Sequence, residues 1–145
     1  RAASSPIDVD LELARKQSSE NPVYYVQYAH ARISSILAKA AESGLTPADD
    51  FAGVLEGDEV ATGLARMVLR LPEVVEDGAR EEETHGITTY AMELATVFHA
   101  FYRDRRVVDP EDPATSAGRL ALVGVTQAAI RNALALLGIS APERM

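Results

Sequence analysis

Apolar residues recur every three or four positions along most of this chain, which is the spacing of helices that bury one face. The clearest run starts at Asn21-Pro22, an N-cap residue followed by proline, and continues to a stop signal at Ser43-Gly44. The sequence therefore predicts a helix over 22–43. Placing residues at 100° per step gives this helix an apolar stripe, expected to face the core: Val23, Val26, His30, Ile33, Leu37 and Ala40.

Further helices are predicted from the same signals. A short helix with apolar positions from Ile7 ends near Ser18, and apolar positions from Val60 to Leu71 indicate another that stops at Pro72. The remaining helices are expected at 72–83, 87–105 and 114–137, with irregular structure at the proline-rich segment 109–113. No segment alternates with period two. We therefore expect an all-α helical bundle of about five main helices over 21–145, preceded by a linker and short helix over 1–20.

The composition limits the chemistry of the chain. It contains no cysteine, and His30, His85 and His99 do not have the spacing of metal ligands, so we expect no structural metal. No signal peptide and no uninterrupted apolar run of about 18 residues is present, so we expect a cytoplasmic protein that does not contact a membrane. Phosphate-binding loops and Ser/His/Asp patterns are also absent, and we expect no catalytic site in this chain.

The formal net charge of −8 argues against broad electrostatic binding to nucleic acid, so any RNA site has to be local. A second stripe of the helix over 22–43 carries Tyr25, Tyr28, Arg32 and Lys39, away from the core stripe. The rings can pack against a neighbouring helix with their hydroxyls in water, which periodicity alone favours. They can also form a platform for unstacked bases, with the cations neutralising phosphates.

The helix over 87–105 repeats this pattern, because Tyr102, Arg106 and His99 flank its core stripe. That stripe consists of Ile87, Tyr90, Ala91, Leu94, Val97, Phe98 and Phe101. Arg103 and Arg105 are expected to be solvated cations at a helix end.

The other unusual residues are not expected to form sites. His30 is expected to be a hydrogen-bonded core histidine, and His85 part of a helix-start turn. Glu81, Glu82 and Glu83 are consecutive, so they point in different directions on a helix and are expected to be a solvated surface segment.

Two segments carry a resemblance to a known family. Residues 21–33, Asn-Pro-Val-Tyr-Tyr-Val-Gln-Tyr-Ala-His-Ala-Arg-Ile, resemble the signature helix of bacterial arginyl-tRNA synthetases, and residues 136–145 resemble the end of that family's C-terminal, DALR-type anticodon-binding domain. Glu93-Leu94-Ala95 with Phe98, Phe101 and Tyr102, and Arg119-Leu120, are similar to further family segments. The chain departs from the family at His85-Gly86 and Tyr90-Ala91, it lacks the tetrapeptide that names the domain, and it has neither ATP-binding signature of the catalytic domain.

The resemblance implies a helical domain that binds the anticodon stem-loop of tRNA-Arg, while a catalytic domain outside this chain binds ATP and arginine. It implies no cofactor in this domain, which would be non-catalytic alone, and two partners, the tRNA and its own catalytic domain; we expect a monomer. The tyrosines would stack on or brace bases, Arg32 would contact base or phosphate, and Met145 would offer an apolar contact or its carboxylate. The implied tRNA-binding residues are Tyr25, Tyr28, Arg32, Tyr102, Arg106 and Met145.

The alternative from another functional class is a helical protein-interaction or scaffold module, in which the tyrosine stripe is an interface. It predicts self-association or a protein partner that does not depend on RNA. No group of residues in the sequence supports a third possibility, a self-contained enzyme.

Overall fold

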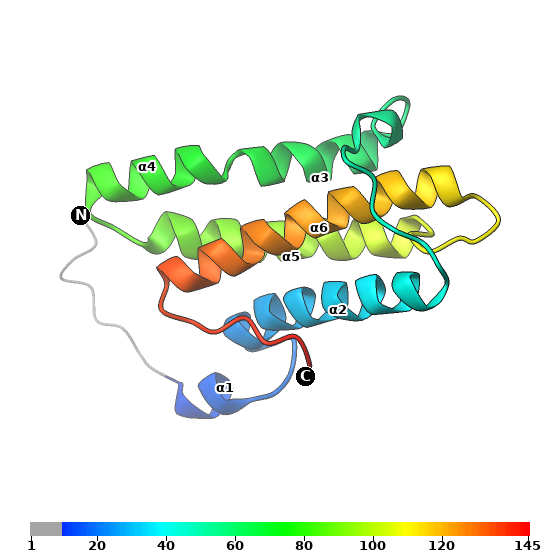
Figure 1. Cartoon of the computed structure of the whole chain (residues 1–145). Coiled ribbons are helices and arrows are strands. Elements are labelled where there is room, and N and C mark those ends of the chain that lie inside the picture. The colour runs from blue at the N-terminus through cyan, green and yellow to red at the C-terminus, as the bar shows by residue number, and fades with distance from the viewer. Residues whose placement is uncertain (1–9) are drawn as a thin grey trace.

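The computed structural model describes residues 10–145, and all regular structure within them is helical (Figure 1). Five helices are longer than ten residues, which confirms the expected all-α bundle, and the first helix and a 3-10 turn (η1) are short. The elements are α1 (Leu11–Arg15), α2 (Pro22–Glu42), η1 (Ala52–Val54), α3 (Glu59–Leu69), α4 (Leu71–Glu81), α5 (His85–Asp104) and α6 (Pro113–Leu136).

Several predicted boundaries were wrong by a few residues. The expected start of the first helix at Ile7 lies outside the described residues, but α1 ends at Arg15 and not near Ser18. The reason is that the Asn21 side chain donates hydrogen bonds to the carbonyls of Ala14 and Lys16. In a longer helix, these carbonyls would instead accept from backbone N–H groups four residues further along the chain. Helix α5 starts two residues before its predicted start. Helix α6 starts one residue early, at Pro113, because proline fits the first turn of a helix.

Helix α5 is central, because it packs against α2, α3, α4 and α6. Figure 1 shows α3 and α4 on one side of the α5–α6 pair and α2 on the other. The largest fully buried side chains come mainly from α5 and α6, and Ile33 and Leu64 add to them from α2 and α3. No described helix is long and apolar enough to span a membrane.

The core stripe expected on α2 was correct at four of its six positions. Val26, His30, Ile33 and Ala40 are buried, whereas Val23 is 41% exposed and Leu37 is only half-buried. Ala29 and Ile36 are buried as well. The buried face is rotated from the predicted one because α2 packs against both α5 and α6.

The ends of α2 and α6 follow the signals in the sequence. The Asn21 side chain accepts hydrogen bonds from the first backbone N–H groups of α2, and Gly44 and Gly138 have the positive φ angles that end α2 and α6. After Gly138, the Ile139 N–H donates to the Leu134 carbonyl at 2.9 Å. This turn directs residues 138–145, which we call the tail, back toward α2 (Figure 1).

Candidate functional site

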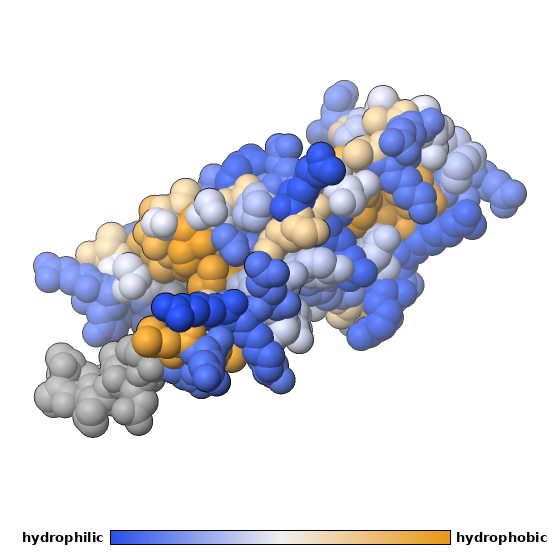
Figure 2. Space-filling view, turned by 90° about the horizontal axis from the view of Figure 1, so that it is seen from below, coloured by the Kyte–Doolittle hydropathy of each residue, from blue (hydrophilic) through white to orange (hydrophobic). Residues whose placement is uncertain are grey.

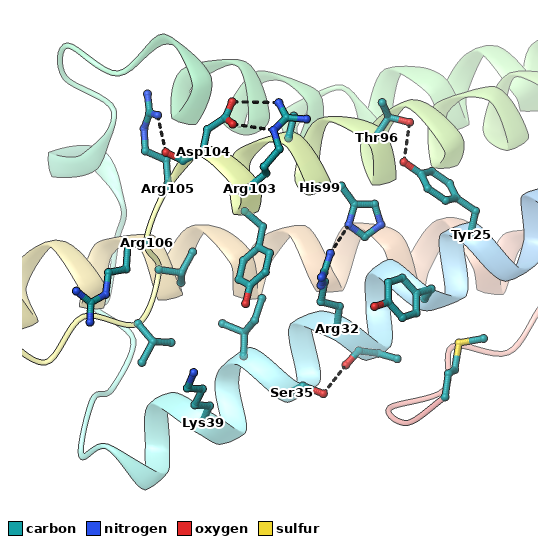
Figure 3. A pocket seen from close by; sticks show the side chains of 18 of the residues that line it. Tyr25, Arg32, Ser35, Lys39, Thr96, His99, Arg103, Asp104, Arg105 and Arg106 are labelled. Carbon is teal, nitrogen blue, oxygen red and sulfur yellow. Dashed lines mark hydrogen bonds and ion pairs between the residues drawn. The ribbon is translucent and has the colours of Figure 1, made fainter. Parts of the chain in front are cut away.

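A groove with a volume of about 1300 Å³ lies between α2, the C-terminal end of α5, the segment 105–108 and the end of the tail. Figure 3 shows Arg32 and Tyr25 pointing into this region from α2, opposite His99 and Thr96 of α5. The structure brings together, along this one groove, every residue that the resemblance implied: Tyr25, Tyr28, Arg32, Tyr102, Arg106 and Met145. Helical periodicity could not have joined them, because they come from four separate segments.

Four planar side chains form a cluster beside the groove: Tyr24, Tyr28, Arg32 and Tyr102. The Arg32 guanidinium carbon lies over the Tyr28 ring at 5.5 Å and over the Tyr102 ring at 4.8 Å, both within cation–π range. The Tyr28 ring also lies nearly parallel to the Tyr24 ring, with centroids 6.4 Å apart and planes 11° apart. Tyr24, Tyr28 and Arg32 meet because they are four residues apart on α2. Tyr24 was missed from the sequence, although this spacing could have identified it.

His99 adds a second side chain of α5 to this cluster. Its Nδ1 accepts a hydrogen bond from Arg32 Nη1 at 3.4 Å, and its ring contacts those of Tyr25 and Tyr28, with centroids 5.2 and 5.9 Å away. Burial, together with the charge of Arg32, lowers the pKa of His99 to about 4. His99 is therefore neutral at neutral pH and can accept from Arg32. From the sequence it was placed on the flank of the helix but assigned no role.

The two tyrosines of the signature helix differ in exposure. Tyr25 is half-buried, and its hydroxyl donates to the Thr96 hydroxyl at 3.3 Å, so the packing interpretation fits this residue. Tyr28 is 39% exposed and presents its ring at the groove. Tyr25 thus braces α2 against α5, whereas Tyr28 is accessible to a ligand.

The groove concentrates positive charge in an acidic chain. Six of the 14 lysines and arginines line it, and among the described residues Asp104 is the one acidic residue that does so. Arg103 is exposed and pairs with Asp104, consistent with the predicted solvated helix end. The basic lining residues are Arg32, Lys39, Arg103, Arg105, Arg106 and Arg144.

The prediction that Arg105 is a solvated cation was wrong. Its guanidinium donates to both carboxylate oxygens of Asp58, at 2.6 and 2.9 Å, and the two side chains are only 29% and 13% exposed. The chain leaves α5 in an extended conformation at Arg105, which takes the side chain to the start of α3, where Asp58 is the N-cap. The Arg105 hydrogen bonds, with those from backbone N–H groups, lower the pKa of Asp58 to about 2.

The segment after Arg105 is held firmly at its backbone. The Arg106 carbonyl accepts from Arg119 Nη1 at 3.0 Å, Val107 is buried, and the Ser116 hydroxyl accepts from and donates to the backbone of Asp109. The Arg106 side chain itself is exposed, and its nearest carboxylate oxygen, on Asp109, is 3.6 Å away. The fold therefore fixes where Arg106 starts and leaves its guanidinium accessible.

The other residues discussed from the sequence lie away from the groove. His30 is 2% exposed and its Nδ1 is hydrogen-bonded to the Pro142 carbonyl, which confirms the predicted core histidine. His85 begins α5, and the glutamates at 81–83 are exposed, as expected. Across residues 10–145, no three histidine or acidic side chains are grouped so as to hold a metal ion.

Comparison with known families decides where the chain belongs. Residues 26–145 match the family model described as the DALR anticodon binding domain. This chain belongs to the DALR anticodon-binding domain family. The family resemblance seen in the sequence is thereby confirmed, and the groove described above is a groove of a DALR domain.

Individual relatives of this DALR domain cover its whole length. Arginine--tRNA ligase of Citrifermentans bemidjiense is 48% identical over 147 residues, and that of Bacillus subtilis is 44% identical over 145 residues; each match covers 100% of this chain and 26% of the relative. The solved structure of Thermus thermophilus arginyl-tRNA synthetase is 32% identical with a TM-score of 0.76, over 96% of this chain and 24% of that one. The chain thus spans about a quarter of the length of its relatives.

Proposed function

We propose that this chain is the anticodon-binding domain of an arginine–tRNA ligase and that its groove binds the anticodon loop of tRNA-Arg. The observation that carries the proposal is the convergence of the six residues implied by the family resemblance on one basic, aromatic groove. Both curated relatives described above are arginine--tRNA ligases.

The chemistry of the groove fits unpaired RNA. Exposed rings such as that of Tyr28 offer faces on which bases stack, which contributes about 1–3 kcal/mol per base. The exposed cations at the rim, Lys39, Arg106 and Arg144, can neutralise phosphates of the loop. Because these charges are gathered in one place, they attract RNA locally although the chain as a whole is acidic.

The joining of arginine to tRNA-Arg would take place elsewhere in the parent protein. We propose that a catalytic domain there binds ATP and arginine. The DALR domain, acting as a monomer, would hold the anticodon so that the distant acceptor end of the tRNA reaches the catalytic domain. No cofactor is assigned to the DALR domain. Contacts from other domains would add to the affinity of the groove for tRNA.

The scaffold alternative receives less support from the surface. Figure 2 shows that the face seen from below Figure 1 is mostly hydrophilic, with separate hydrophobic patches. Leu11, Val23, Leu69, Val125 and Leu136 are exposed on four different helices. A protein interface of ordinary size has instead a continuous apolar centre.

The test is a titration of this chain against a fluorescently labelled RNA hairpin that carries the anticodon stem and loop of tRNA-Arg, at low salt, followed by anisotropy. A hairpin with the same stem and an unrelated loop is the comparison. Replacing Tyr25 and Tyr28 together by alanine should weaken binding about 5- to 150-fold, the loss of one stacked base. The control Tyr90→Phe, which removes a buried hydroxyl that donates to the Met67 carbonyl, should leave binding unchanged. Equal affinity of the double variant and the wild type would refute the proposal.

A further inference from the structure

The tail reaches the groove only because it folds back along α2. Gly138, with a φ of 71°, turns the chain after α6, and Ile139 and Ala141 then pack partly buried against the core. Arg144 and Met145 follow, and both line the groove. A guanidinium and a flexible thioether are thereby added to a site formed otherwise by α2, α5 and the segment 105–108.

Two side chains of α2 hold the tail by its backbone. Gln27 Nε2 donates to the Ser140 carbonyl at 2.9 Å, and His30 Nδ1 lies 2.9 Å from the Pro142 carbonyl. Since a carbonyl only accepts, Nδ1 of His30 carries the proton. Gln27 and His30 are three residues apart and thus neighbours on one face of α2, so they bind alternate carbonyls of the extended tail.

We call Gln27 and His30 the clamp, and the part of α2 that carries His30 is anchored in the bundle. His30 is 2% exposed, and the Gln127 amide of α6 donates to the His30 carbonyl at 3.2 Å and to the Ser34 hydroxyl at 2.7 Å. The turn of α2 that carries His30 is therefore fixed by α6. Neither Gln27 nor His30 lines the groove.

We propose that Gln27 and His30 are positioning residues, which hold the tail against α2 so that Arg144 and Met145 form one wall of the groove. That this wall contacts RNA rests on the proposed function. The physical benefit is pre-organisation, because a tail already ordered in the free protein does not lose that conformational freedom on binding. Without the two donors, the tail would keep the hydrogen bonds of its first two residues to the end of α6 and the apolar contacts of Ile139 and Ala141.

The first test needs no RNA. Gln27→Leu removes the donor with little change in volume, and backbone ¹⁵N relaxation of the 145-residue chain reports the order parameters of tail amides. We expect values near those of the helices in the wild type and values below about 0.6 after Ser140 in Gln27→Leu. His30→Leu should behave alike, whereas His30→Asn, which can donate from a similar position, should restore order. The control Tyr90→Phe should leave the tail ordered. An equally ordered tail in Gln27→Leu and His30→Leu would overturn the proposal.

The second test is a double-mutant cycle with the tRNA-Arg hairpin. Gln27→Leu should raise the Kd roughly three- to tenfold, as expected for losing a hydrogen bond that orders the wall. In the background Arg144→Ala/Met145→Ala it should have no further effect, because nothing remains for the tail to present. The same factor in both backgrounds, or no rise in the first, would contradict the clamp.

The two tests separate this proposal from the proposed function. If the wild type does not distinguish the hairpin from the unrelated loop, the RNA assignment fails, while the order parameters still decide whether Gln27 and His30 hold the tail.

Discussion

Replacing Asp58 by asparagine isolates the ion pair that joins the ends of α3 and α5. Asp58 accepts two hydrogen bonds from Arg105, at 2.6 and 2.9 Å, and its Oδ1 also accepts from the backbone N–H groups of Val60 and Ala61 at 3.0 Å. Asparagine caps a helix about as well as aspartate does, so Asp58→Asn should keep the cap and remove the charge pair.

The size of the effect follows from the pKa of Asp58. A decrease from 3.8 to about 2 corresponds to about 2.4 kcal/mol of stability. Part of this decrease comes from the cap hydrogen bonds that asparagine keeps, and Arg105 remains 29% exposed to screening solvent, so the ion pair itself contributes about 1–2 kcal/mol. The folded-state pKa is lower than the unfolded one, so this contribution is complete above about pH 4 and is lost as the pH falls from 3.8 toward 2.

The assay is urea unfolding of the wild type and Asp58→Asn between pH 7 and pH 2.5. We expect the free energies of unfolding to differ by about 1–2 kcal/mol at pH 7 and at pH 5, and the difference to shrink below pH 4. The matched control is Asp77→Asn, which removes an exposed pair with Arg80 on α4 and should cost less than about 0.5 kcal/mol. Equal costs for the two variants, or a difference at Asp58 that persists unchanged at pH 2.5, would refute this reasoning.

Three further predictions concern packing, pH and salt. A Cβ added at Gly118 would lie 2.6 Å from a valine side chain of η1, so Gly118→Ala should cost about 1–3 kcal/mol in urea unfolding, whereas Gly124→Ala, with open space, should not destabilise α6. The folded-state pKa of His99 is about 4, below the usual 6.5, so the unfolded chain binds a proton at a higher pH than the folded chain does. The free energy of unfolding of the wild type should therefore decrease from pH 6.5 to pH 4, and His99→Gln should lack this decrease. An identical pH dependence would contradict the neutral histidine. Lys39→Gln should reduce the slope of log affinity for the hairpin against log salt concentration by about 1, whereas Lys16→Gln, outside the groove, should not change it. Equal slopes for Lys39→Gln and the wild type would show that Lys39 does not contact a phosphate of the hairpin.

Local signals predicted the fold well where neighbouring residues decide the structure. Asn21-Pro22 and Gly44 mark the ends of α2 because capping depends on a few adjacent residues. The exposure of Val23 and the burial of Ile36 depend instead on which two helices pack against α2. Periodicity gives the width of a buried face but not the direction of its neighbours.

The groove was less accessible to sequence reasoning. Periodicity placed Tyr28 and Arg32 on one stripe, but only the family resemblance joined them to Met145. The pair of Arg105 with Asp58 spans 47 positions and that of His30 with Pro142 spans 112, so no local pattern could show either. The role of His99 was not predicted, because it depends on Arg32, on another helix.

The most direct test of the proposal that the groove binds RNA is a map of the binding surface by NMR. The side-chain signals of labelled tyrosines and arginines would be followed while the tRNA-Arg anticodon hairpin is added. Binding in the groove predicts saturable shifts at Tyr28, Arg32 and Tyr102, with Arg80 on α4 unchanged. Shifts centred on α4, or none that saturate in the groove, would contradict it.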